Sequence, residues 1–310
     1  MLVLNKFTML VGVAGCGKST FAKELTKAGA IVVSSDEIRG ELWGDENDQQ
    51  NPAKVFEEAH RRIKYLLKSG YWVVFDATNL SARRRENFLK ELRKFDCEKE
   101  CAVILTPFDV IMERMQYRTR KVPAHIVHKQ ICSFQCPHYY EGWDSIKLIW
   151  DVTCVDEDMR DYFKLCETTK NDNHNHSTEM IMDHIDNAVL CFAINYSKRK
   201  DFNVKIVEEA IRYHDIGKPQ TKVFHNSKGE PTEEAHYYGH QNYSAYLYLI
   251  THPDFITSEE RIRYRLDVAN LIQFHMEHFF RTPEALQKFY TKIGFGKELE
   301  VIRTCDMEGH

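Results

Sequence analysis

The stretch GVAGCGKST, residues 12–20, decides the fold of the first half of this chain. It follows an apolar run and precedes a helical pattern, and it fits the spacing G-x-x-x-x-G-K-[ST]. Its glycines let backbone N–H groups turn inward around phosphate oxygens, and the helix that begins near Lys18 adds its positive end. Lys18 is expected to reach the β- and γ-phosphates of ATP, and Ser19 to bind Mg²⁺. A chance glycine turn seldom has both the strand and the helix in place, so the stretch predicts a nucleotide site.

Apolar runs of strand type alternate with helical patterns from residue 1 to about residue 155. The runs are Phe7–Val13, Ala30–Ser34, Trp72–Asp76, Ala102–Thr106 and Lys147–Val152. This alternation predicts βαβ units and a parallel sheet. Residues 167–177 (ETTKNDNHNHS) are polar and typical of a linker, and nearly everything beyond them has helical periodicity. The expected organisation is an α/β domain over residues 1–166, a linker over 167–177 and an all-α domain over 178–310.

Polar side chains follow the second and third predicted strands, at the sheet edge where open α/β sheets bind ligands. Asp36 and Arg39 follow the second strand, and Asp76 and Asn79 follow the third. A carboxylate at position 36 can accept the proton of an attacking hydroxyl, and Arg39 can hold a phosphate of the acceptor. Asp76 can organise Mg²⁺ or substrate. The alternative for the first pair is an aspartate that caps the next helix and an arginine on its exposed face.

Cations are concentrated after the fourth predicted strand, in the run RMQYRTRKVP of residues 114–123. Arg114 and Arg118 share one helical face by their spacing. Phosphoryl transfer spreads negative charge over the transferred group, and kinases close a basic lid over it. An exposed basic helix is the alternative interpretation. With these arginines, the predicted nucleotide-binding residues are Gly12, Gly15, Cys16, Gly17, Lys18, Ser19, Thr20, Arg114 and Arg118.

Four strings in the first half together resemble the polynucleotide 5′-kinase branch of the P-loop kinases, the phage type that repairs broken RNA and DNA ends. They are GVAGCGKST, SSDEIR, FDATNLSARRR and ERMQYRTRKVP, and PHYYEGWD is similar to the family's closing segment. The resemblance implies a P-loop kinase in which Lys18 is the phosphate-loop lysine and Asp36 the general base. Arg39 would bind the acceptor phosphate and Arg118 would be the lid arginine. The predicted substrate contacts are Asp36, Arg39, Asp76 and Asn79. Related branches phosphorylate small molecules with similar strings, so the acceptor stays open.

The chain contains 15 histidines, and several in the second half lie on predicted helices. His184 is in line with the apolar residues of its helix, so its ring is expected to face the interior. His214 and Asp215 close the next apolar helix, and Asp306 lies near the end of the sequence. A lone histidine on an apolar face is usually a core residue. Imidazoles and carboxylates from several helices, however, suit a divalent transition metal with positions left for water.

The order His184, His214-Asp215 and Asp306 resembles the HD phosphohydrolase superfamily over about residues 178–308. The strings HDIGK and GHQNYSA are characteristic of that superfamily. The resemblance implies that these four side chains bind metal and that the second domain is of the HD type. A purely structural origin of the set is the alternative.

Three further residues extend this second resemblance. His240 and His275 match members of the superfamily that hold two metals, so one or two divalent ions of unknown identity are expected. Lys218 would be a catalytic lysine that contacts phosphate. For His240 and His275 a structural role stays open, since neither belongs to the core order of the motif.

Composition excludes other classes of function. A formal net charge of −4 gives no strong global attraction to nucleic acid, although a local basic groove remains possible. The nine cysteines lack the spacing of a disulfide scaffold and indicate a reducing compartment. The N-terminus has no signal-peptide pattern, and no apolar run approaches the roughly 20 residues that span a bilayer. A cytoplasmic protein without a membrane partner is expected.

The two motif sets together predict a bifunctional enzyme that repairs nucleic-acid ends. The first domain would phosphorylate 5′-hydroxyl ends of RNA or DNA with ATP, and the second would remove 3′-phosphates or 2′,3′-cyclic phosphates. Two alternatives stay open. Both domains could act on a nucleotide or another small metabolite, or the HD domain could be a non-catalytic nucleotide sensor that regulates the kinase. The oligomeric state is not predicted.

Overall fold

The computed structural model describes residues 5–46, 48, 50–151, 158–172, 180–253 and 258–308 of the 310-residue chain. The chain forms two compact units. Unit 1 comprises Met1–Gln130 and Pro137–Thr153, and unit 2 comprises Ile131–Cys136 and Cys154–His310. The polypeptide therefore enters unit 2 at residues 131–136 before it completes unit 1. Among the described residues, no helix is long and apolar enough to cross a membrane.

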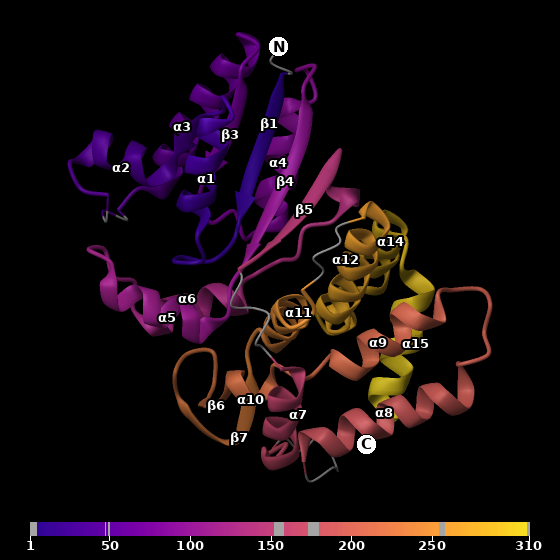
Figure 1. The fold of residues 1–310 in the computed structure, drawn as a ribbon. Helices are drawn as coiled ribbons and strands as arrows, with labels where there is room; N and C mark the ends of the chain where they lie inside the picture. The colour runs from indigo at the N-terminus through magenta and orange to yellow at the C-terminus, as the bar shows by residue number, and fades with distance from the viewer. Residues whose placement is uncertain are drawn as a thin grey trace. The chain divides into compact units, whose positions relative to one another are not determined.

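Unit 1 is built on a five-stranded parallel sheet with the strand order β2-β3-β1-β4-β5 (Figure 1). The strands are β1 (Lys6–Val11), β2 (Ile31–Ser34), β3 (Trp72–Asp76), β4 (Glu98–Leu105) and β5 (Ser145–Trp150). The central strand β1 is buried from its second residue onward, which explains its continuous apolar run. The carboxyl ends of all five strands lie at one edge, where ligands of open α/β sheets bind.

The described residues of unit 1 also form six helices and one short turn of 3₁₀ helix. They are α1 (Lys18–Lys27), α2 (Ser35–Trp43), α3 (Pro52–Lys68), α4 (Ala82–Leu92), α5 (Phe108–Tyr117), α6 (Ala124–Cys132) and η1 (Tyr139–Glu141). Helix α3 begins where the Asn51 side chain accepts the Lys54 amide, and Pro52 fits its first turn. Helices α3 and α4 share a face of the sheet, because His60 stacks on Phe88 at 3.8 Å between ring centroids. Helix α5 lies at the end toward which the strand arrows point (Figure 1).

A buried ion pair fixes the chain after β3. Arg85 and Glu141 are 1% and 0% exposed at their side chains and form two hydrogen bonds, of 2.8 and 2.6 Å. Arg85 also donates to the carbonyl oxygens of Asn79 and Leu80. Asn79 adopts the left-handed conformation, with φ +49°, and its side-chain amide donates to the Leu10 carbonyl at 2.8 Å. Parts of the strings FDATNLSARRR and PHYYEGWD therefore serve to hold this turn.

Unit 2 is mostly helical. Its helices are α7 (Met159–Thr168), α8 (Ile181–Asn195), α9 (Val204–Tyr213), α10 (Lys218–Thr221), α11 (His240–Ile250), α12 (Glu259–Phe274), α13 (Glu277–Phe280), α14 (Pro283–Ile293) and α15 (Gly296–Glu308). Helix α9 packs against α8, α12 and α15, and α11 packs against α12. Helix α11 is buried from Tyr243 to Ile250, so it is a core helix without a solvent face over that stretch.

The segment of residues 131–136 belongs to the core of unit 2. The Phe134 ring meets Tyr246 edge-on at 5.2 Å, and the Cys136 amide donates to Gln273 Oε1 at 2.7 Å. Asn242 Nδ2 donates to the Cys132 carbonyl at 2.8 Å. Phe134 and Cys136 are fully buried. Unit 2 is therefore completed by residues that precede most of it in the sequence.

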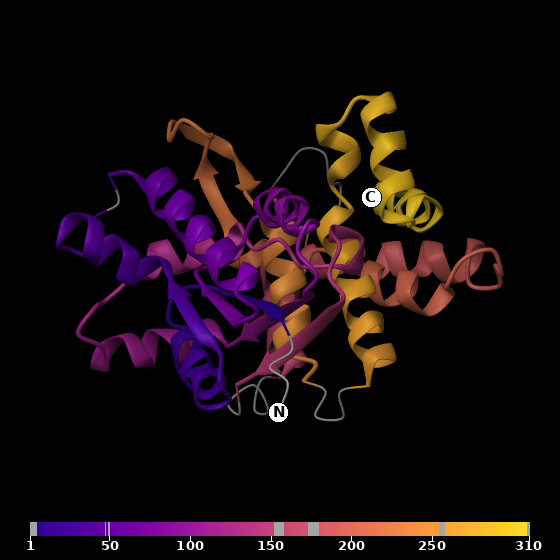
Figure 2. The same cartoon turned by 90° about the horizontal axis from the view of Figure 1, so that it is seen from above.

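Several sequence predictions need correction in this half. The antiparallel hairpin of β6 (Lys222–His225) and β7 (Pro231–Tyr237) was not predicted in this mostly helical half, and Figure 2 shows it in orange as a two-stranded arm. Helix α7 covers the first residues of the predicted linker and packs on α8 and α10, so it belongs to unit 2 rather than to the first domain. The rest of the predicted linker, apart from residues 169–172, lies outside the described residues.

Predicted and observed elements otherwise agree well. Strand β3 has the predicted bounds, and the other predicted strands are shifted by a few residues. In the second half, the helical stretch of residues 259–280 is divided into α12 and α13. The parallel-sheet α/β architecture of the first half is confirmed. The second half is predominantly helical, as expected.

Candidate active sites

The loop between β1 and α1 has the backbone that its glycines predict. Gly15 and Gly17 have φ values of +84° and +100°, a region that side chains disfavour. A Cβ atom on Gly15 would lie 2.5 Å from Met115 Cε, so the neighbouring helix α5 also excludes a larger residue there. The Gly12 amide donates to the Thr78 carbonyl at 3.1 Å, which ties the loop to the end of β3.

Lys18, Ser19 and Asp76 meet beside this loop. Lys18 is 8% exposed, and its ammonium donates to the Val13 carbonyl at 2.8 Å, across the loop. Burial raises the pKa of Asp76, while the Lys18 ammonium and a hydrogen bond from Ser19 oppose that rise. A serine hydroxyl and a carboxylate in contact are oxygen ligands of the kind that Mg²⁺ prefers. The predicted lysine, serine and second carboxylate are thus brought together.

A cavity of about 1250 Å³ opens at this edge of the sheet, and all of its lining belongs to unit 1. Because the glycine loop follows the central strand, the lining residues fall into two sets, one from each side of that strand. The first set, here called the acceptor arm, lies on the β2 and β3 side and comprises Ser35, Asp36, Arg39, Pro52, Phe56, Asp76 and Arg84. The second set, the second arm, comprises Arg114, Tyr117, Arg118, Ile126, Ile149, Trp150 and Asp151. Single-ligand pockets are typically about 300–1,000 Å³, so this cavity has room for two substrates.

Asp36 is held by two arginines in the acceptor arm. Its Oδ1 atom accepts from Arg39 Nη1 at 2.5 Å, and its Oδ2 atom accepts from Arg120 Nη1 at 2.6 Å. Arg39 is 6% exposed, and its buried Nε has no partner among the described residues. The Asp36 side chain itself is 48% exposed and faces the cavity. Arg120 was not singled out from the basic run by sequence, because helical spacing favoured Arg114 and Arg118.

The other predicted residues of this half have different surroundings. Arg118 borders the glycine loop, since a Cβ atom on Gly15 would lie 3.9 Å from its Nη1. Arg114 pairs with Asp151 at 2.6 Å in the second arm. Asn79 is buried on the Leu10 carbonyl and does not line the cavity. A contact that the sequence did not predict is the 2.7 Å hydrogen bond from the Ala14 amide to Gln130 Oε1.

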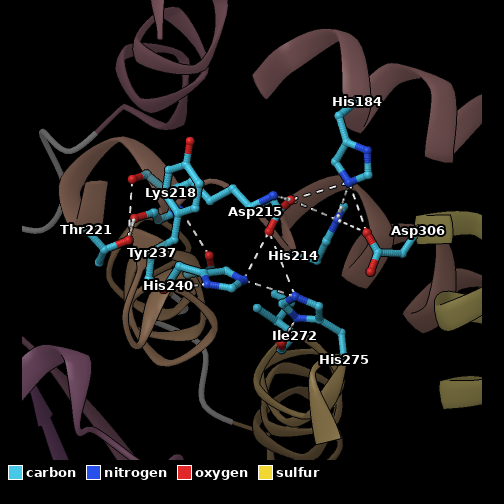
Figure 3. Close-up of polar contacts among 12 residues, drawn as sticks. His184, His214, Asp215, Lys218, Thr221, Tyr237, His240, Ile272, His275 and Asp306 are labelled. Carbon is cyan, nitrogen blue, oxygen red and sulfur yellow. Dashed lines mark hydrogen bonds and ion pairs between the residues drawn. The ribbon is translucent and has the colours of Figure 1, made fainter. Parts of the chain in front are cut away.

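In unit 2, four helices and the segment after α9 bring histidines and aspartates to one place (Figure 3). His184 comes from α8, His214 and Asp215 from the end of α9, His240 from the start of α11, His275 from the end of α12 and Asp306 from α15. The four histidines and Asp215 are at most 5% exposed. A close backbone approach supports the arrangement, because a Cβ atom on Gly217 would lie 2.7 Å from the Ser244 amide.

Three of the imidazoles are anchored through Nδ1. Their Nδ1–H groups donate to carbonyl oxygens three residues earlier: His214 to Ile211 at 2.6 Å, His240 to Tyr237 at 2.8 Å and His275 to Ile272 at 2.6 Å. With Nδ1 as the donor to a carbonyl oxygen, Nε2 is the ring atom through which each imidazole would bind an ion. Metal-binding histidines characteristically donate the other ring N–H in this way.

The Nε2 nitrogens form two groups that share Asp215. In the first, His184 Nε2 lies 3.3 Å from His214 Nε2 and 2.9 Å from Asp306 Oδ1. Asp215 Oδ2 lies 3.4 and 3.3 Å from the nitrogens of His184 and His214. The ligand atoms of each group lie within 4.8 Å of one another.

The second group lies on the opposite side of the same carboxylate. His240 Nε2 and His275 Nε2 are 3.3 Å apart, and Asp215 Oδ1 lies 3.3 and 3.8 Å from them (Figure 3). Each oxygen of Asp215 thus faces one pair of imidazoles. A carboxylate in this position can bridge two ions. The predicted four-residue set and the extra histidine pair are therefore brought together at one carboxylate.

Protonation in this cluster is strongly perturbed. Burial alone would lower the pKa of His214, but the carboxylates of Asp215 and Asp306 outweigh it and raise the pKa to about 10. Burial would raise the pKa of Asp215, yet His214 and Lys218 hold it well below its usual range. The pKa of His275 is lowered to about 3 by burial and by the neighbouring histidines. The cluster thus keeps the Asp215 and Asp306 carboxylates ionised and the His275 imidazole neutral, while His214 carries a proton.

The residues fit a divalent metal. Buried imidazole nitrogens and carboxylate oxygens in two closely spaced groups suit transition metals of the zinc, iron or manganese type. Both Asp215 oxygens are buried and accept no geometrically good hydrogen bond. Lys218, which is 4% exposed, places its ammonium 2.6 Å from Asp215 Oδ2 and 5.4 Å from the centre of the Tyr237 ring. The Lys218 ammonium therefore neutralises part of the Asp215 charge beside the two groups of ligand atoms.

Comparison with known proteins concerns mainly the first half. Residues 7–137 match the family model described as "AAA domain". A curated relative, L-seryl-tRNA(Sec) kinase of Methanococcus maripaludis, is 22% identical over an alignment of 185 residues, and the match covers 57% of this chain and 69% of the relative. The family match agrees with the nucleotide-binding loop of unit 1. The family match ends at residue 137, so the function of unit 2 is inferred from the residues of that unit.

Solved structures also resemble the chain weakly. One is the structure of the Pnkp1/Rnl/Hen1 RNA repair complex, with 23% identity and a TM-score of 0.38 over 41% of this chain and 43% of that one. Another is a gluconokinase from Sinorhizobium meliloti 1021, with 18% identity and a TM-score of 0.36 over 48% of this chain and 84% of that one. The chain spans about two fifths of the RNA-repair chains that it matches.

Proposed function

We propose that this protein is a bifunctional enzyme of nucleic-acid end repair. Unit 1 transfers the γ-phosphoryl group of ATP to 5′-hydroxyl ends of RNA or DNA. Unit 2 is an HD-type phosphohydrolase that removes 3′-phosphate or 2′,3′-cyclic phosphate ends with one or two divalent metals. The observation that carries the proposal is the presence of two separate polar clusters, one in each unit, whose residue types match these two reactions.

Support for the kinase comes from the loop, the cavity and the relatives together. The glycine loop and Lys18 bind the phosphates of a nucleoside triphosphate. The cavity adds a carboxylate that faces solvent between two arginines, Arg39 and Arg120. The family match and the curated kinase agree with phosphoryl transfer. The motif strings favour a polynucleotide acceptor over a metabolite.

Each residue of the unit 1 site has its own role in the phosphoryl transfer. Asp36 takes the proton from the acceptor hydroxyl as its oxygen forms a bond to the γ-phosphorus. The bond from that phosphorus to the β,γ-bridging oxygen breaks, and ADP leaves. Lys18 and Arg118 neutralise the charge that spreads over the transferred group. Ser19 and Asp76 would hold Mg²⁺, which would offset the negative charge of the phosphates. Arg39 positions Asp36 and a phosphate of the acceptor.

Support for the hydrolase comes from Asp215 and its surroundings. Two groups of imidazole nitrogens face its two oxygens, which is the donor set expected of a shared carboxylate in a two-metal site. A divalent ion bound there would supply Lewis acidity and an activated water. Lys218 would bind a phosphoryl oxygen of the substrate and offset its charge. The Nδ1 anchors of His214, His240 and His275 hold the rings in place.

The proposal is tested by incubating the purified protein with defined oligonucleotides. Labelled ATP and a 5′-hydroxyl oligonucleotide report the kinase, and a 3′-phosphate or 2′,3′-cyclic phosphate oligonucleotide with Mn²⁺, Ni²⁺, Zn²⁺ or Mg²⁺ reports the hydrolase. We expect label transfer in the first assay and phosphate release or ring opening in the second. If no label is transferred to either RNA or DNA, the proposal that unit 1 phosphorylates polynucleotide ends is wrong.

A second acceptor is favoured by one comparison. The curated relative is a kinase of L-seryl-tRNA(Sec), whose acceptor hydroxyl belongs to an amino acid carried by RNA. Seryl-tRNA therefore belongs in the same assay as the 5′-hydroxyl oligonucleotides. Transfer to seryl-tRNA and not to oligonucleotide ends would keep unit 1 a kinase and change its acceptor.

A further inference from the structure

The acceptor arm contains an aromatic side chain that the roles above do not use. Phe56, in the second turn of α3, lines the cavity together with Asp36 and Arg84. Its ring packs edge-on against Phe75 at 6.0 Å and against His60 at 6.4 Å, which fixes it from the core side. A phenyl ring in a polar cavity, rigidly supported from behind, is a surface on which a planar group can stack.

Arg84 stands over this ring. Its guanidinium carbon lies 5.9 Å from the Phe56 ring centre. Arg84 is exposed and pairs with no carboxylate among the described residues, in contrast to Arg39 and Arg120, which both bind Asp36. The arm therefore holds an uncompensated cation beside an aromatic face. This combination suits a ligand that is aromatic and anionic at once.

We propose that Phe56 and Arg84 form a subsite for the terminal nucleotide of the acceptor. The nucleobase that carries the 5′-hydroxyl stacks on Phe56, and Arg84 pairs with the phosphate on the 3′ side of the same nucleotide. The site is distinct from the predicted contacts of Asp36 and Arg39. The inference rests on the proposed polynucleotide acceptor, and it makes Phe56 a specificity-determining residue that distinguishes nucleotides from sugars and other acceptors without an aromatic ring.

The test for Phe56 compares two acceptors, one with a normal 5′-terminal nucleotide and one with an abasic 5′-terminal residue that keeps its hydroxyl. Wild-type protein should bind the normal acceptor better, with a KM lower by about 5- to 100-fold. Phe56→Leu should raise the KM of the normal acceptor by a similar factor and leave the abasic acceptor and the KM for ATP almost unchanged. Tyr65→Ala removes an aromatic ring from the same helix that lies outside this cavity, and it should change neither KM.

The test for Arg84 compares a nucleoside 3′-monophosphate with the same nucleoside lacking phosphate. Arg84→Gln should raise the KM of the phosphorylated acceptor by about tenfold and leave the other unchanged. The neighbouring Arg83→Gln, at an exposed position that does not line the cavity, is the matched control.

The outcomes separate the inference from the proposed function. An active wild-type enzyme that uses normal and abasic ends equally well, or a Phe56→Leu variant that loses both equally, would overturn the subsite and leave the kinase assignment intact. A wild-type enzyme that labels no polynucleotide at all would overturn the proposed acceptor and this subsite with it.

Discussion

At the scale of residues, Asp215 is the centre of the account of unit 2. Each of its oxygens faces a pair of imidazole nitrogens, and Lys218 lies against it at 2.6 Å. The buried Asp215 carboxylate is thus surrounded by the positive charge of Lys218 and by histidine nitrogens. If both groups bind an ion, Asp215 would connect the two sites, and substitutions on its two sides should have separable effects.

Removal of one imidazole from the group of Asp215, His240 and His275 should halve the metal content of the protein. We expect wild-type protein to bind about two divalent ions per chain and His240→Ala to bind about one, because the group of His184, His214 and Asp306 stays complete. Metal analysis of protein dialysed against Mn²⁺ measures the ratio. His252→Ala removes a histidine of unit 2 outside the cluster and should leave the ratio at two. One ion in both wild type and His240→Ala would contradict the shared-carboxylate interpretation.

Metal binding should release a proton from His214. In the metal-free protein the pKa of this imidazole is raised to about 10, so it is protonated at neutral pH. A ligand nitrogen must be deprotonated, and affinity should therefore increase with pH between about 6 and 9, by up to tenfold per unit. Calorimetry in buffers of different ionisation enthalpy counts the released proton. A pH-independent affinity in this range would show that His214 is not a ligand.

The prediction of single residues from sequence was best where a motif gives both type and spacing. Lys18, Ser19 and the four residues of the H…HD…D order were predicted from motifs, and the structure brings the members of each set together. Arg120 and Phe56 could not be predicted, because a basic run has many equivalent cations and an aromatic at helical spacing is usually core. Asn79 was predicted to contact substrate, but its side chain hydrogen-bonds to the Leu10 carbonyl and stabilises the turn. An asparagine after a strand can serve either purpose.

At the scale of elements, a buried ion pair connects α4 to η1. Arg85 and Glu141 are almost fully buried, and Arg85 also binds the carbonyl oxygens of the turn after β3. Such a pair is costly to break, because the remaining charge is left without compensation. The turn that it holds provides the Thr78 carbonyl to the glycine loop. The stability of this pair and the shape of the nucleotide site are therefore related.

Glu141→Gln should lower the free energy of unfolding by about 3–5 kcal/mol, since it leaves the Arg85 charge buried and unpaired. Chemical denaturation followed by tryptophan fluorescence measures the change. The control is Glu98→Gln, which breaks a partly exposed pair with Lys6 and should cost less than about 1 kcal/mol. Equal effects of the two substitutions would contradict a structural role for the buried pair.

The helices and strands that could be predicted are those whose apolar pattern is visible within a short stretch of sequence. The apolar runs of β1 and β3 and the regular stripes of α9 and α14 are visible in the sequence because each is buried in a simple way. The hairpin β6–β7 was missed although its turn carries Asn226 and Gly229, because its short strands are half exposed and follow a helical segment. Helix α7 was missed because its neighbours suggested a linker.

At the scale of the whole molecule, the boundary between the units is not a single point in the sequence. Residues 131–136 precede the last strand of unit 1 and yet pack inside unit 2, through Phe134, the Cys136 amide and the Cys132 carbonyl. Sequence composition cannot reveal such an exchange, because only tertiary contacts distinguish these residues from the helix before them. A cut at the predicted linker would remove part of the core of unit 2.

A fragment of residues 154–310 should therefore be less stable than unit 2 in the full chain. It would leave the Gln273 side chain without its partner and uncover the face of Tyr246 that Phe134 covers. A peptide of residues 129–137 added in excess should raise the thermal midpoint of the fragment, and the same peptide with Phe134→Ala should raise it less. Near-ultraviolet circular dichroism follows the transition. A fragment as stable as unit 2 in the intact protein, and indifferent to the peptide, would contradict this assignment.

The central claim is that two independent sites perform two reactions, and reciprocal inactivation tests it most directly. Lys18→Ala and Asp215→Ala are each assayed for label transfer from ATP to a 5′-hydroxyl oligonucleotide and for release of a 3′-phosphate, with folding checked by circular dichroism. We predict that Lys18→Ala loses the kinase by at least about 100-fold and keeps the hydrolase, and that Asp215→Ala does the reverse. Loss of both reactions in either folded variant would contradict the claim.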